Sequence, residues 1–159
     1  MVLEFISVCI GVSGLVFGLY QYYAANKVRR SETLSELIFK LGSDEEIRSA
    51  IYLFEYDNCW FNGSFRDSET EIKVDKTLQY LSYICYLYEQ RIIKKNEFNV
   101  FEYEIARLFQ NDCTIDYFNF LKGFSEDVVG KRNGKAPFPF QDLLDFGIEN
   151  GYIDSPSLQ

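Results

Sequence analysis

The chain has 159 residues, of which 47% are hydrophobic and 18% aromatic, and its formal net charge is -8. This composition excludes an intrinsically disordered chain, and the length allows one modest domain with an anchoring segment. Only three prolines and ten glycines interrupt runs rich in Leu, Ile, Phe and Tyr, which favours an all-α fold. Residues 31–159 contain 13 basic and 23 acidic side chains, so we expect no binding to nucleic acid.

An apolar run opens the chain from Phe5 to Ala25 and is long enough to cross a bilayer, which takes roughly 20 helical residues. A cleavable signal peptide would carry its basic residues before the run, whereas here Glu4 precedes it and the basic residues follow. A buried core helix would be apolar on one face, whereas this run is apolar all around. We therefore predict a transmembrane anchor helix over residues 1–26.

Aromatic and basic residues follow the apolar run directly. Such residues anchor a helix at the membrane interface and keep its basic end in the cytoplasm. The pattern predicts a single-pass membrane protein, in contact with lipid, with a very short N-terminus outside and the C-terminal domain in the cytoplasm. These interface residues are Tyr20, Tyr22, Tyr23, Lys27, Arg29 and Arg30.

Small residues repeat along one face of the apolar run: Ser7, Gly11, Gly14 and Gly18. Two small-x-x-x-small pairs in register let two helices approach closely in lipid, which predicts a homo-oligomer. The alternative is that glycine is simply frequent in membrane helices.

The rest of the chain shows helical periodicity. It predicts a juxtamembrane helix over residues 27–42, a compact cytosolic bundle of about five helices over 43–153, and a flexible tail over 154–159. Ser43 and Glu46 suit a capping box at the start of the bundle. The helices are expected near 44–56, 69–91, 96–110, 114–128 and 140–150.

Core residues follow from the same spacing. The helix near 44–56 should bury Ile47, Ala50, Ile51 and Phe54, and the helix near 69–91 should bury Ile72, Leu78, Leu81, Cys85 and Tyr88. The loop between them carries Trp60, Phe61 and Phe65, which either pack onto the helices or form an exposed contact patch. Packing is the favoured interpretation, because large aromatic side chains are mostly buried.

The chain contains no histidine, which removes the commonest general base, the commonest zinc ligand and every Ser–His or Cys–His pair. The cysteines include no C-x-x-C pair, which predicts free, buried thiols in a reducing compartment. They are Cys9, Cys59, Cys85 and Cys113. We expect no cofactor, no metal and no catalytic residue, and therefore a protein that is not an enzyme.

Two features invite other interpretations. Lys131, Arg132 and Lys135 lie in a glycine-containing loop that lacks the spacing and hydroxyl residue of a phosphate-binding loop. The loop is either solvated or binds an anion or an acidic partner. Carboxylate pairs could ligate a divalent metal in a hydrolase, but they alternate with aromatic residues, as solvent-facing helix positions do. These pairs are Glu102 with Glu104, Asp112 with Asp116, and Asp142 with Asp145.

Four blocks in order, NKVRRSETLSELI, IRSAIYLFEYD, VDKTLQYLSYICYLYE and APFPFQDLLDFG, follow the apolar run. Together they resemble small bacterial membrane-anchored helical proteins of unknown function. The resemblance implies a bacterial source and a helical cytosolic domain, and it supplies no site residues. We expect a single-pass protein of a bacterial inner membrane whose acidic interaction or sensor domain binds a cytosolic protein partner. The alternative, by analogy with phage-defence and prophage proteins of this layout, is a membrane-perturbing effector triggered through that domain.

Overall fold

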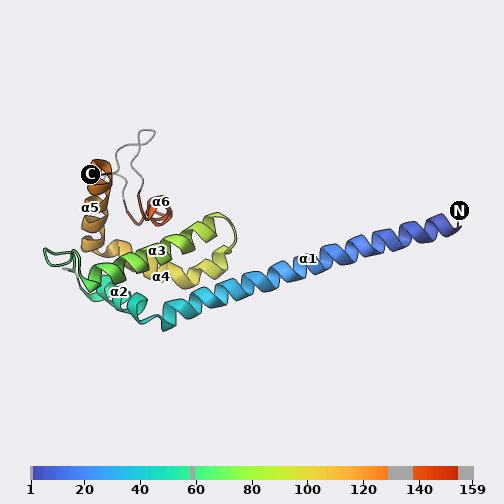
Figure 1. The fold of residues 1–159 in the computed structure, drawn as a ribbon, viewed down its shortest axis with the longest axis horizontal. Coiled ribbons are helices and arrows are strands. Elements are labelled where there is room, and N and C mark those ends of the chain that lie inside the picture. Colours follow the sequence, from blue (N-terminus) through green and yellow to red (C-terminus); the bar gives the residue numbers. More distant parts are fainter. Residues whose placement is uncertain (1, 58–59, 129–137, 154–159) are drawn as a thin grey trace. The chain divides into compact units, whose positions relative to one another are not determined.

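The structure is a computed structural model that describes residues 2–57, 60–128 and 138–153, without the side chains of residues 2–10 and 12. These residues form six α-helices and no strand, which confirms the all-α prediction (Figure 1). The chain divides into two compact units, Met1–Ile38 and Phe39–Gln159. The helices are α1 (Val2–Ser43), α2 (Glu45–Tyr56), α3 (Glu69–Glu89), α4 (Lys95–Gln110), α5 (Asp112–Val128) and α6 (Gln141–Glu149).

Helix α1 is continuous over 42 residues, so one helix covers both the predicted anchor and the predicted juxtamembrane segment. The prediction of Ser43 as the next N-cap is wrong by one residue. Asp44 has extended backbone angles, and its Oδ1 accepts hydrogen bonds from the amides of Glu46 at 3.1 Å and Ile47 at 3.3 Å. Ser43 still belongs to α1, because the chain leaves helical geometry only at Asp44.

No helix in the described part of the chain is both long and apolar enough to cross a membrane. The prediction of a transmembrane helix over residues 1–26 therefore gains no support from the structure. Part of the predicted span lies outside the described residues, namely residue 1 and the side chains of 2–10 and 12. The remainder is shorter than the roughly 20 apolar residues that a crossing needs.

Helix α3 is the centre of the second unit and packs chiefly against α2 and α6 (Figure 1). Its buried face runs through Val74, Leu78, Leu81 and Cys85, which are completely inaccessible to solvent. The prediction that Ile72 also points inward is wrong, since its side chain is 65% exposed. Residue 72 lies half a turn away from residue 74, and the core face begins at the latter.

The aromatic loop packs inward, as predicted. Trp60 and Phe65 are 3% and 2% exposed, and their rings lie 5.1 Å apart between centroids. Both rings also contact Tyr117 of α5, at 5.8 Å and 5.2 Å. This aromatic cluster joins the loop before α3 to α5 and contributes to a single hydrophobic core for the second unit.

Candidate binding groove on the helical domain

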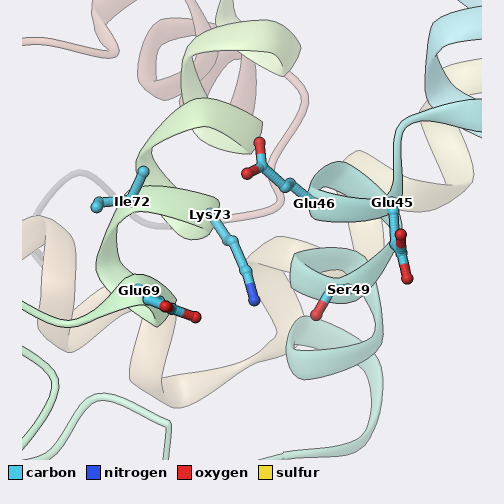
Figure 2. Close-up of a pocket in the computed structure, with 6 residues that line it drawn as sticks. All are labelled: Glu45, Glu46, Ser49, Glu69, Ile72 and Lys73. Atoms are coloured by element: carbon cyan, nitrogen blue, oxygen red, sulfur yellow. The ribbon is translucent and has the colours of Figure 1, made fainter.

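A groove of about 510 Å³ opens between the first turns of α2 and α3 (Figure 2). Its walls carry three carboxylates, one ammonium group, one hydroxyl and one apolar side chain. The lining residues are Glu45, Glu46, Ser49, Glu69, Ile72 and Lys73.

Local helix chemistry explains the acidic character of the groove. Glu45 and Glu46 lie in the first turn of α2, and Glu69 lies in the first turn of α3. Carboxylates at these positions interact favourably with the positive end of the helix dipole. Ser68 caps α3, since its Oγ accepts a hydrogen bond from the amide of Glu71 at 3.2 Å. The acidic groove therefore combines carboxylates from the first turns of two neighbouring helices.

Lys76 of α3 lies beside the groove and pairs with residues of α2. Lys76 Nζ lies 2.8 Å from Asp44 Oδ2 and 2.5 Å from Glu46 Oε2, so α3 holds both the cap and the first turn of α2. The hydrogen bond from Lys76 lowers the pKa of Asp44, in spite of partial burial, and the same partners raise the pKa of Lys76. This pair is partly exposed, so we assign it a positioning role and little net stability.

Lys73 provides the ammonium group that lines the groove. Figure 2 shows its side chain directed between Glu69 and Ser49. Among the described residues, no ion pair engages its ammonium group. Three carboxylates, against Lys73 in the lining and Lys76 beside it, leave the groove with a net negative charge, which favours a cationic ligand. In the same described residues, no group of three or more Cys, Asp or Glu side chains is placed to hold a metal ion.

The predicted carboxylate pairs lie in separate surroundings. Glu102 accepts a hydrogen bond from the hydroxyl of Tyr152 at 3.1 Å. Burial raises the pKa of Glu104, and the neighbouring Glu55 raises it further. Asp145 accepts from Gln141 at 2.8 Å within α6. Glu102 and Asp145 thus each accept a hydrogen bond, whereas Glu104 lies beside another carboxylate.

The structure describes only some of the other predicted site residues. Tyr20, Tyr22 and Tyr23 are exposed on α1, as are Lys27 and Arg29, and Arg30 is half-buried. The side chain of Ser7 and the loop residues Lys131, Arg132 and Lys135 lie outside the described residues. Cys85 and Cys113 are buried free thiols, as predicted, whereas Cys59 and the side chain of Cys9 are not described.

Sequence reasoning missed the groove. The acidic residues after Ser43 were interpreted only as a helix start, and Ile72 was assigned to the core. The available indication was that two predicted helices both begin with acidic first turns, Glu45–Glu46 and Glu69. The sequence could not show that residues of these two turns line the same groove.

Comparison of the chain with models of known protein families, with curated proteins and with solved structures finds no match. The resemblance to small membrane-anchored helical proteins therefore stays a prediction from the sequence.

Proposed function

We propose that this protein is a single-pass inner-membrane protein whose acidic cytosolic domain binds a protein partner. The observation that carries the proposal is the uneven distribution of charge between the two units. Met1–Ile38 holds three basic and three acidic side chains, whereas Phe39–Gln159 holds 13 basic and 21 acidic ones and therefore the whole formal charge of -8. An apolar, neutral unit suits lipid, and an acidic one suits water and a basic partner.

The surface of α1 supports the membrane assignment. Leu15 and Phe17 are 66% and 61% exposed, and Leu19 is exposed to the same degree as Phe17. So many large apolar side chains exposed on one helix are unfavourable in water, and we expect lipid or another protein surface to cover them. The basic residues that follow, Lys27 and Arg29, would place the second unit in the cytoplasm.

A binding role for the second unit is supported by its chemistry. Its groove is open and charged, and the six residues that line it include no cysteine. Elsewhere in the unit, burial raises the pKa of the Cys85 thiol, which keeps this sulfur protonated and unreactive. A groove that carries charge without an activated nucleophile suits recognition of another molecule better than covalent catalysis.

Fractionation of bacterial cells tests the membrane assignment. The full chain should sediment with membranes and resist extraction by alkaline carbonate, because its apolar residues would lie in the lipid. A shortened chain that begins at Ser31 is the control and should be found in the soluble fraction. Extraction of the full chain by carbonate would contradict the proposal.

A second candidate function is a membrane-perturbing effector. The observation that favours it concerns the glycines of α1. A Cβ added at Gly11, Gly14 or Gly18 would meet no other atom within 4 Å, so packing within this chain does not require glycine there. Their small size would instead serve close contact with a second helix in lipid.

A further inference from the structure

One face of α2 is left uncovered in the described part of the chain and carries two tyrosines. The helix buries Ile47, Ala50 and Phe54 on one side. On the opposite side, Glu45, Ser49, Tyr52 and Tyr56 follow each other at spacings of three and four residues, which places all four on a single stripe. Tyr52 and Tyr56 are 54% and 72% exposed.

A third exposed tyrosine comes from α4. Tyr103 is 57% exposed, and its hydroxyl donates a hydrogen bond to Glu55 Oε1 at 3.1 Å. Because Glu55 lies three residues after Tyr52 and neighbours it on the helix surface, this contact brings the α4 tyrosine to the side of α2 that carries Tyr52. We call Tyr52, Tyr56 and Tyr103 the tyrosine surface.

The rings of the tyrosine surface are held in place. Those of Tyr52 and Tyr56 stack with centroids 6.0 Å apart and planes 24° from parallel. Arg107 ties α4 to the end of α2, since its Nη2 donates to the carbonyl oxygen of Glu55 at 3.1 Å. Pre-positioned aromatic rings lose little conformational entropy on binding, and tyrosine is enriched among the residues that dominate binding energy at protein interfaces.

Carboxylates flank the tyrosine surface on both sides. Toward α4 lie Glu55 and Glu104, which are close enough that Glu55 helps to raise the pKa of Glu104. Toward α3, the same stripe of α2 contributes Glu45 and Ser49 to the lining of the acidic groove, and Glu69 of α3 lines it as well. Near the tyrosines the cations are Arg48 and Arg107, and the guanidinium of Arg107 is engaged by α2 and by Gln110. In the groove, Lys76 pairs with Asp44 and Glu46, which leaves Glu45 and Glu69 against Lys73.

We propose that the tyrosine surface and the adjoining acidic groove bind an arginine- and lysine-rich segment of a protein partner. Guanidinium and ammonium groups stack on tyrosine rings and pair with carboxylates. The charge of -8 on the second unit attracts such a segment over a longer range. This inference rests on the proposed partner-binding function and adds the chemical class of the partner and the surface that receives it.

The test measures binding of fluorescein-labelled nona-arginine to the full chain in non-ionic detergent by fluorescence anisotropy. Tyr52→Ala combined with Tyr56→Ala should weaken binding by about 5- to 30-fold, as expected for the loss of two exposed cation–π contacts. The matched control is Tyr83→Ala with Tyr86→Ala, which removes another exposed, stacked pair on α3. Neither double variant changes the net charge, so the control should bind within about twofold of the parent chain.

A third variant separates binding from folding. Tyr52→Phe with Tyr56→Phe keeps both rings and should keep the affinity, whereas a loss equal to that of the alanine pair would contradict the proposal. Equal weakening by the α2 and α3 alanine pairs would show that the peptide stacks on any exposed tyrosine pair, and no weakening by either pair would show that it senses only net charge. Either result would overturn the proposal. A change of oligomeric state in the α2 alanine pair would identify a second copy of the chain as the occupant.

The outcome is independent of the membrane test. A chain that carbonate extracts from membranes but that binds nona-arginine through the tyrosine surface would refute the anchor alone. A membrane-embedded chain with no preference for the tyrosine surface would refute this inference alone.

Discussion

At the scale of single residues, Glu89 shows how the fold concentrates negative charge. It is the last residue of α3, where the helix dipole already disfavours a carboxylate. Burial raises the pKa of Glu89, and Asp142, Glu149 and Asp145 of α6 raise it further. Because the folded-state pKa lies above the ordinary value of 4.5, ionisation of Glu89 at neutral pH costs stability.

We predict that Glu89→Gln raises the melting temperature by about 1–2 °C at pH 7, because a surface charge change is worth at most about 0.5 kcal/mol. The gain should vanish below pH 4.5, where Glu89 is protonated in both the folded and unfolded states. Calorimetry at both pH values measures the effect. Asp116→Asn removes one exposed acidic charge of α5 and is the control; an equal gain from it would show that only net charge matters.

At the scale of helices, Asn111 connects α2 to α5. Its Nδ2 donates to the carbonyl oxygens of Phe54 at 3.0 Å and Asp57 at 2.9 Å, and its Oδ1 accepts from the amide of Cys113 at 3.0 Å. The residue is buried, so these groups have no access to water if the side chain is lost. One side chain thus satisfies both the end of α2 and the start of α5.

Asn111→Ala should lower the free energy of unfolding by about 2–3 kcal/mol, because it leaves buried carbonyl and amide groups without partners. Urea denaturation measures this change. Asn62→Ala is the matched control, since Asn62 is exposed and its Oδ1 accepts hydrogen bonds from Ser64, two residues away in the same loop. A loss in the Asn111 variant no larger than in the control would contradict the assigned role.

The helices themselves could be predicted closely, whereas their contacts could not. The span expected near 96–110 is observed as Lys95–Gln110, and that expected near 140–150 as Gln141–Glu149. Periodicity and turn residues are local properties, so they define where helices begin and end. The connection made by Asn111 depends on a residue more than 50 positions away in the chain, which no local pattern encodes.

At the scale of the whole molecule, the glycine stripe of α1 makes a prediction about assembly. The full chain in detergent should be a defined oligomer, and Gly14→Ile should reduce it to monomers, because a large side chain keeps two helices apart. Light scattering measures the mass. A chain beginning at Ser31 should be monomeric as well, and a monomeric parent chain would contradict self-association through α1.

The same variant separates the two candidate functions. If the protein is an effector, its induced expression should arrest growth, and Gly14→Ile should relieve the arrest together with oligomerisation. If the protein is an anchor for a partner, expression of the parent chain and expression of the Gly14→Ile variant should both be harmless. A toxic Gly14→Ile variant would exclude assembly through the stripe as the cause of toxicity.

The sequence alone determined the all-α class, the helix spans, the buried aromatic loop and the concentration of negative charge after the apolar run. These properties follow from composition and from spacings of a few residues, which act locally. Only the tertiary structure decided that Ile72 lines a groove, that Glu45 and Glu69 line the same groove, and that Tyr103 of α4 bonds to Glu55 of α2. Each of these depends on which helices pack together and in what register, and that is set by the combined burial of many side chains across the core.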